Sequence, residues 1–209
     1  MQKPITAALL TALFTLALPA TAQEPIEDYY RLVRPAQATQ SEDRVEVLEI
    51  FFYGCVHCYG YEPHLLHWLA NKPEAAEFRR MPAIYGANMR PLAKAYYTAE
   101  KLGVLDNVHQ ALFDAIHVAE KPIYDDDSIR SFFISRGIDA DRFDNVYHSR
   151  EIATRVRQAE VMTRNYRING VPAVVVNGKY MTGPSMARGY ERLETVLNEL
   201  IRREASLPR

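Results

Sequence analysis

The feature that most constrains this chain is a pair of cysteines, Cys55 and Cys58, the only two in its 209 residues. A disulfide between them would enclose only two residues. Closing so small a loop stabilises a fold by about 2 kcal/mol, against about 3 kcal/mol for a 15-residue loop, so the pair is a poor structural staple. Thiols at C-x-x-C spacing suit redox exchange instead, because one can attack a partner and the other can resolve the mixed disulfide.

The first 22 residues have the pattern of an export signal. Lys3 supplies a positive start, residues 5–18 form an apolar run, and residues 20–22 (Ala-Thr-Ala) are the small residues that a signal peptidase needs. The run is shorter than the roughly 20 residues of a transmembrane helix. We therefore expect residues 1–22 to be a cleaved signal peptide, with an uncleaved anchor helix as the alternative. Export to an oxidising compartment favours disulfide chemistry.

The segments on either side of the first cysteine predict a strand and a helix. Residues 44–53 alternate and then become continuously apolar, which is typical of a central strand covered on both faces. A glycine ends this run, and residues 55–69 follow helical spacing. Cys55 is thus expected on the first helical turn, where unpaired N–H groups and the helix dipole stabilise an anion. Its pKa should be lowered, and Cys58 should be more shielded.

His57 lies between the two cysteines and is a candidate to stabilise the Cys55 thiolate. A protonated imidazole would do so through its charge or through a hydrogen bond. The alternative is a histidine that is solvated on the first helical turn and takes no part in the exchange.

The rest of the chain predicts a second strand, a helical block, and a closing hairpin and helix. Residues 78–85 form the second strand, which Pro82 confines to an edge, a bulge or an end of pairing. Five helices are expected after it, at 91–102, 107–119, 128–136, 142–148 and 152–166. Strands at 171–176 and 179–182 are joined by an Asn-Gly hairpin turn, and 190–203 is an amphipathic helix. The pattern predicts an α/β fold with an inserted helical domain.

Metal and haem sites are alternatives for the cysteine pair. A zinc set can be drawn from Cys55, Cys58, His64 and His67. These residues come from one helical segment, whereas a structural zinc site usually links two elements. Covalent haem needs C-x-x-C-H, and Tyr59 occupies the histidine position. Residues 125–128 (Asp-Asp-Asp-Ser) suit a helix cap better than a calcium site. We expect no metal and no cofactor.

Three segments together resemble the DsbA family of periplasmic thiol:disulfide oxidoreductases. They are Leu48 to Phe52, Cys55 to Tyr59, and the distant Gly170 to Pro172. The resemblance extends over essentially the whole mature chain, including the Val-Asn-Gly-Lys-Tyr hairpin. It implies a thioredoxin-like fold with an inserted all-helical domain. The implied division is a thioredoxin-like domain at 23–87 and 168–209 and a helical insertion at 88–167.

The resemblance implies a role for each residue at the cysteine pair. Cys55 matches the family's nucleophile, and Cys58 matches its buried partner, with which it forms the redox-active disulfide. His57 matches the histidine that stabilises the thiolate. Val56 departs from the proline that most often stands there, which makes the oxidising strength of the pair harder to predict.

The resemblance also implies roles for residues distant from the pair. Val171 and Pro172 match a loop whose proline is cis and faces the active site. A cis Pro172 would expose the Val171 N–H and carbonyl, which could then pair with an extended substrate peptide. From the residues alone, a trans proline that starts a strand is the alternative. Glu49 matches a buried acid that tunes the pKa values of the cysteines. The basic partner of that acid is unassigned between Arg79 and Arg80.

By resemblance, the protein donates the Cys55–Cys58 disulfide to reduced exported polypeptides in the periplasm and works as a monomer. A stabilised thiolate makes the disulfide a stronger oxidant, and DsbA is the established example. A quinone-coupled inner-membrane oxidase of the DsbB type is expected to reoxidise the pair. Nucleic acid is not an expected partner, because 25 Lys and Arg balance 26 Asp and Glu, and a nucleic-acid binder normally has a basic excess.

Other functions stay open for the same residues. The chain could be a disulfide isomerase or reductase, a peptide-binding module without turnover, or a metal-binding module. Known periplasmic isomerases carry a dimerisation domain before the catalytic one, and too few residues precede Cys55 for such a domain.

Overall fold

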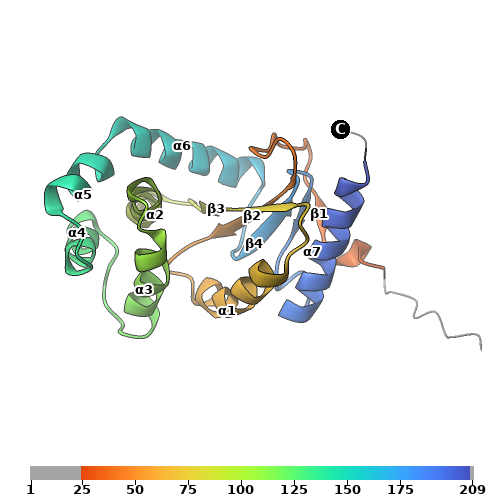
Figure 1. Ribbon diagram of the computed structural model, residues 1–209, viewed down its shortest axis with the longest axis horizontal. Helices are drawn as coiled ribbons and strands as arrows, with labels where there is room; N and C mark the ends of the chain where they lie inside the picture. The colour runs from red at the N-terminus through yellow and green to blue at the C-terminus, as the bar shows by residue number, and fades with distance from the viewer. Residues whose placement is uncertain (1–24, 208–209) are drawn as a thin grey trace, which may run out of the picture.

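A five-stranded mixed sheet lies at the centre of the fold in the computed structural model, which describes residues 25–207 (Figure 1). The strand order is β1-β5-β4-β2-β3; β2 pairs with β3 in parallel, and the other neighbours pair antiparallel. The strands are β1 Arg31–Leu32, β2 Val45–Phe51, β3 Ala76–Pro82, β4 Ala173–Val176 and β5 Tyr180–Thr182. The expected signal peptide, residues 1–22, lies outside the described residues.

β2 is the buried central strand that the sequence predicts. All seven of its residues are buried, and it lies between β4 and the edge strand β3. The predicted continuation of β3 to residue 85 is wrong, because pairing stops where Phe51, the last residue of β2, faces Pro82. The last bond of this ladder runs from the Ala83 N–H to the Phe51 carbonyl at 2.7 Å, beyond which β2 offers no partner. The segment that carries the cysteines follows directly after the end of β2.

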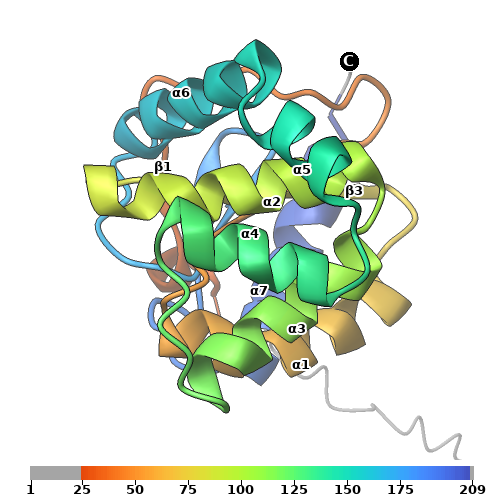
Figure 2. The ribbon, with the colours of Figure 1, turned by 90° about the vertical axis from the view of Figure 1, so that its left-hand side faces the viewer.

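Helices cover both faces of the sheet (Figure 1). α1 and α7 lie on one face, where Trp68 and Leu197 share a core with Val47 of β2. The layer of helices α2 to α6, seen from outside in Figure 2, shares a second core with Leu48 of β2. The helices are α1 Val56–Asn71, α2 Arg90–Leu102, α3 Leu105–His117, α4 Asp126–Ser135, α5 Ala140–Tyr147, α6 Arg150–Asn165 and α7 Tyr190–Ala205, with short 3-10 helices at Glu27–Tyr29 and Ala87–Met89.

The five helices between β3 and β4 agree with the sequence prediction. α4, α5 and α6 begin about two residues before their predicted starts, because Asp125, Asp139 and Ser149 cap them by accepting bonds from backbone N–H groups. Asp125 and Ser128 form a reciprocal capping box, which confirms the capping interpretation of the acidic run. Within residues 25–207, no three His, Cys, Asp or Glu side chains gather where they could hold a metal ion. None of the described helices is long and apolar enough to span a bilayer.

The cap of α4 gives a direct test of this local structure. Asp125→Ala removes the oxygen that accepts the Ser128 N–H bond at 2.8 Å, and we expect the melting temperature to fall by about 2–4 °C. Asp127→Ala is the matched control, since it removes the same charge from the first turn without removing the cap. Equal losses in thermal unfolding of the two variants would contradict the assignment of the cap.

Candidate active site

Cys55 is the N-cap of α1, one residue before the first helical turn on which the sequence places it. The chain leaves β2, turns through a bond from the Cys55 N–H to the Phe52 carbonyl at 3.0 Å, and enters the helix at Val56. Gly54 leaves room for the ring of Phe52 in this turn, because a Cβ there would lie 2.5 Å from that ring and would displace it. The turn aims the Cys55 side chain at the N–H groups that open the helix.

The two thiols have opposite environments. Both are free in this structure; Cys55 is partly exposed, whereas Cys58 is completely buried. The Cys55 Sγ accepts a bond from the Cys58 N–H at 3.4 Å. Hydrogen bonding from the Cys58 side chain is the largest influence that lowers the pKa of Cys55 to about 6, and the N–H groups of Cys58 and His57 lower it further. Burial, followed by the hydrogen bond to Cys55, raises the pKa of Cys58.

His57 lies on the exposed side of the first turn of α1. Its backbone N–H and its charge both lower the pKa of Cys55, although each does so less than the Cys58 side chain. The direction agrees with the role implied by the sequence. The helix terminus and the second cysteine therefore contribute more to the low pKa than the histidine.

A loop that is distant in the sequence, at Val171 and Pro172, lies beside Cys55. The Val171–Pro172 peptide bond is cis, as the family resemblance implies, and it directly precedes β4. The Val171 carbonyl lies 3.4 Å from the Cys55 Sγ. Gly183 allows the loop to sit there, since a Cβ at this residue would lie 2.8 Å from the Pro172 oxygen. Polar backbone groups of the loop therefore lie beside the reactive thiol.

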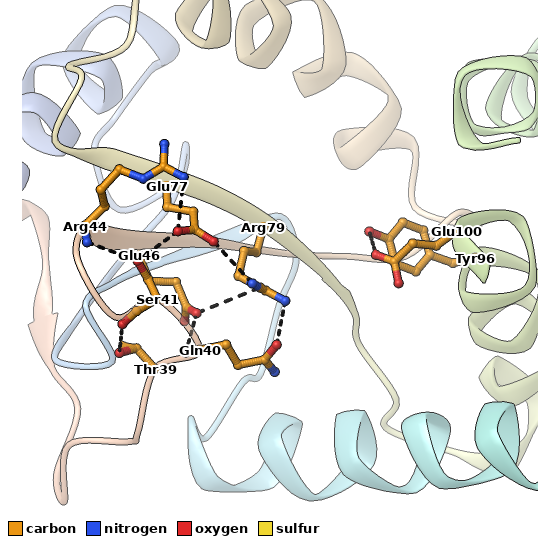
Figure 3. Close-up of polar contacts among 9 residues, drawn as sticks. All are labelled: Thr39, Gln40, Ser41, Arg44, Glu46, Glu77, Arg79, Tyr96 and Glu100. Carbon is orange, nitrogen blue, oxygen red and sulfur yellow. Dashed lines mark hydrogen bonds and ion pairs between the residues drawn. The ribbon is translucent and has the colours of Figure 1, made fainter. Parts of the chain in front are cut away.

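The arginine that pairs with Glu49 is Arg80. Glu49 is fully buried in β2, and Arg80 on the adjacent strand donates from Nε to its Oε2 at 2.6 Å. Alternation along β3 turns Arg79 to the opposite face, where it contacts Gln40, Glu46 and Glu77 (Figure 3). Strand register thus settles the choice that the sequence left open.

Glu62 is a member of this charged cluster that the sequence analysis missed. Arg80 Nη2 donates to both of its carboxylate oxygens, at 3.0 and 2.8 Å. Glu62 lies one helical turn after Cys58 on α1, so helical spacing places both on the buried side, and that spacing was the available clue. A single guanidinium thus serves two buried carboxylates beneath the cysteines.

Glu49 is close enough to influence the cysteine pair electrostatically. Burial raises its pKa to about 7, while Arg80 acts in the opposite direction. A negative Glu49 also raises the pKa of Cys58. The Oε1 atom of Glu49 has no hydrogen-bond partner among the described residues. The carboxyl group is therefore able to take up or release a proton near neutral pH.

The residues of the alternative zinc set do not converge. His64 and His67 are exposed on α1, and the His64 ring stacks on Tyr190 of α7 with centroids 3.9 Å apart. Cys58 lies in the core shared with α2 to α6. The histidines and the buried thiol thus occupy different sides of the helix.

The pKa of Cys55 predicts how pH affects the stability of the reduced protein. A pKa of about 6, below the unfolded value of about 8.5, means that the thiolate stabilises the fold above pH 8.5 and loses this effect as pH falls through 6. Between pH 6 and 8 the reduced form should gain about 1–2 kcal/mol over the oxidised form, after allowance for solvent screening. Above about pH 8.5 the raised pKa of Cys58 opposes this gain. Paired urea denaturation of both forms checks it, and a gap that is constant with pH would contradict it.

A partly exposed low-pKa thiol at a helix N-terminus, a shielded second thiol and an X-Pro loop beside them define a thiol:disulfide oxidoreductase. The sheet carries this site at the end of β2, with a block of helices inserted between β3 and β4.

The chain belongs to the DsbA family. Residues 75–201 match the family model described as a DSBA-like thioredoxin domain. The chain is 36% identical over 213 residues to the thiol:disulfide interchange protein DsbA of Azotobacter vinelandii, covering 99% of each chain. It is 33% identical to the protein of that name from Pseudomonas aeruginosa, covering 93% of this chain and 92% of the relative.

Solved structures agree with this assignment. A crystal structure of Pseudomonas aeruginosa DsbA superposes with a TM-score of 0.80 at 32% identity, covering 85% of this chain and 92% of that chain. A crystal structure of DsbA from Xylella fastidiosa gives a TM-score of 0.78 at 29% identity, covering 86% and 96%. The predicted thioredoxin-like fold with a helical insertion is thereby confirmed, and the protein is a disulfide oxidoreductase.

Proposed function

We propose that the protein uses Cys55 and Cys58 to oxidise reduced polypeptides after their export. The single observation that carries the proposal is the asymmetry of the two thiols: the pKa of Cys55 is lowered to about 6, and that of Cys58 is raised. A group that is stable as a thiolate is a good leaving group, so the disulfide readily accepts electrons.

The reaction proceeds in two exchanges. A substrate thiolate attacks the Cys55 sulfur, the Cys55–Cys58 bond breaks, and Cys58 leaves with the electron pair. The raised pKa of Cys58 means that it takes a proton, and Glu49, whose pKa is raised to about 7, is the nearby buried group proposed to exchange it. A second substrate thiolate then attacks the substrate sulfur of the mixed disulfide and releases Cys55 as a thiolate. The substrate gains one disulfide, and the protein gains two electrons.

The loop at Val171 and Pro172 is the proposed substrate contact. Its carbonyl lies 3.4 Å from the Cys55 Sγ, so an extended peptide bonded to that sulfur would pass along the loop backbone. His57 is proposed to add positive charge beside the Cys55 thiolate, as its effect on the Cys55 pKa supports.

The cellular setting follows from the same proposal. We place the mature protein, after loss of residues 1–22, in the periplasm as a monomer. A DsbB-type, quinone-coupled membrane oxidase is the proposed electron acceptor. The proposed division of the mature chain is a thioredoxin-like domain at 23–87 and 168–209 and a helical insertion domain at 88–167.

The proposal is tested by mixing the oxidised protein with a peptide that contains two reduced cysteines. We expect one peptide disulfide to form for each Cys55–Cys58 disulfide lost, as alkylation and mass measurement of both partners would record. Binding of the peptide without thiol transfer would instead indicate a peptide-binding module.

A further inference from the structure

Two histidines of α3 hold opposite ends of Tyr53, a buried residue of the segment that leads to Cys55. The Tyr53 hydroxyl lies 2.7 Å from Nδ1 of His109, and the Tyr53 backbone oxygen lies 2.7 Å from Nε2 of His117. The histidines are roughly two helical turns apart, so the tyrosine spans this length of the helix. α3 belongs to the helical layer and lies against α1 (Figures 1 and 2).

The partners of the two histidines fix their hydrogen-bond roles. A carbonyl oxygen only accepts, so His117 donates from Nε2 whether or not the ring is charged. Nε2 of His109 faces the Glu62 carboxylate at 3.4 Å, which assigns the proton to that nitrogen. Nδ1 of His109 then accepts from the Tyr53 hydroxyl. Burial supports this assignment, because it raises the pKa of Tyr53 and lowers that of His109.

The same histidines also contact residues of α1 that follow the cysteine pair in the sequence. The His117 ring stacks on Tyr59, which directly follows Cys58, with centroids 5.2 Å apart and planes at 19°. His109 reaches Glu62 one turn later. α3 therefore contacts the chain both before and after the two cysteines.

The contacts of Tyr53 matter for the cysteine pair because Tyr53 is joined to Cys55 through the turn at Gly54. A Cβ at Gly54 would displace the nearby Phe52 ring, and glycine leaves the backbone with little restraint of its own. The distance of 3.4 Å between the Cys55 Sγ and the Cys58 N–H depends on this turn. The bond from the Cys55 N–H to the Phe52 carbonyl closes the turn, and Tyr53, on the other side of the glycine, is the residue through which α3 can add a further restraint.

We propose that α3 is a positioning element of the redox site, in which His117 and His109 fix Tyr53 and, through it, the turn that presents Cys55. The inference rests on the proposed role of Cys55 as the exchanging thiolate. It makes the two histidines positioning residues that act through Tyr53.

The test compares His117→Phe with His117→Gln in the full mature protein. Phenylalanine keeps a ring for stacking on Tyr59 but cannot donate, whereas glutamine keeps an N–H donor at a similar reach. The ultraviolet absorbance of the thiolate, followed against pH, reports the pKa of Cys55, and thermal unfolding is measured in parallel. His64→Phe is the control, because it makes the same change to a histidine stacked on a tyrosine of another helix.

We expect His117→Phe to raise the Cys55 pKa by about half a unit, which is a roughly threefold smaller thiolate fraction below that pKa. His117→Gln and His64→Phe should titrate like the wild type. If His117→Phe does not fold, Tyr53→Phe decides, since it loses only the His109 bond and should shift the pKa by a smaller amount in the same direction.

Two results would overturn the inference. A lower melting temperature with an unchanged Cys55 pKa in His117→Phe, or an unchanged pKa in Tyr53→Phe where His117→Phe does not fold, would show that the contacts are merely structural. A wild-type Cys55 with an ordinary pKa near about 8.5 would instead remove the proposed function together with this inference. The wild-type titration therefore separates the two failures.

Discussion

Cys55→Ser should abolish disulfide transfer, whereas Cys58→Ser should accumulate mixed disulfides with substrates. Cys55 is the partly exposed thiol with the lowered pKa, and Cys58 is buried with a raised pKa. Removal of an enzyme's nucleophile can cost on the order of 10⁶ in rate, so the loss in Cys55→Ser should be at least about 10³-fold. Without Cys58, the bond between Cys55 and a substrate has no internal thiol to resolve it.

Electrophoresis without reductant, before and after addition of dithiothreitol, measures both outcomes. Cys58→Ser should give complexes that disappear on reduction, and the Cys55→Ser variant should give none. Complexes that form through Cys58 in Cys55→Ser would reverse the assignment of the attacking thiol. The double variant provides the background for both measurements.

Arg80→Met should cause the largest loss of stability among the variants considered. Arg80 is the counter-charge for Glu49 and Glu62, which are both buried. Removal of one partner from a buried ion pair commonly costs about 3–5 kcal/mol, because a charge is left without compensation. Urea denaturation should show a loss of this size in the free energy of unfolding.

Arg79→Met is the matched control for Arg80→Met. It removes the same charge from the adjacent position of β3, but Arg79 is more exposed and lies 4.0 Å from Glu46. Its loss should be well under that of Arg80→Met. Equal losses of stability in the two variants would show that the loss comes from replacing any arginine of β3 and not from leaving the buried carboxylates without their counter-charge.

The loss in the free energy of unfolding caused by Arg80→Met should depend on pH. Loss of Arg80 raises the pKa of Glu49 further, and an acid with a raised folded pKa destabilises the fold increasingly above its unfolded pKa of about 4.3. The loss should therefore be larger at pH 8 than at pH 5. Glu49→Gln in the same background should recover part of it at pH 8, and denaturation of the single and double variants at both pH values measures this.

Local patterns were sufficient to predict the elements around the site. The apolar run before Cys55 predicted β2, because a strand buried on both faces needs apolar residues at consecutive positions. The Asn-Gly pair predicted the turn between β4 and β5, where Asn177 and Gly178 both have positive φ. The exception is β1, which the sequence did not predict, because its two residues, Arg31 and Leu32, are too few to show a periodic pattern.

Contacts between distant segments could not be predicted in the same way. The choice of Arg80 over Arg79 depends on the register of β3 against β2, which no local pattern encodes. His109 and His117 lie on a predicted helix, but their contacts with Tyr53 depend on how α3 packs against the end of β2. The sequence therefore predicted which residues are candidates for the exchange, while the groups that hold them required the fold.

Equilibration of the protein with glutathione buffers tests the central claim most directly, because it measures whether the Cys55 thiolate makes the disulfide an oxidant. We expect half-reduction at a potential more positive than about −200 mV, on a scale that runs from about −270 mV for thioredoxin to about −120 mV for DsbA. A midpoint at or below about −270 mV would mean that the disulfide is the stable form, and it would contradict the account.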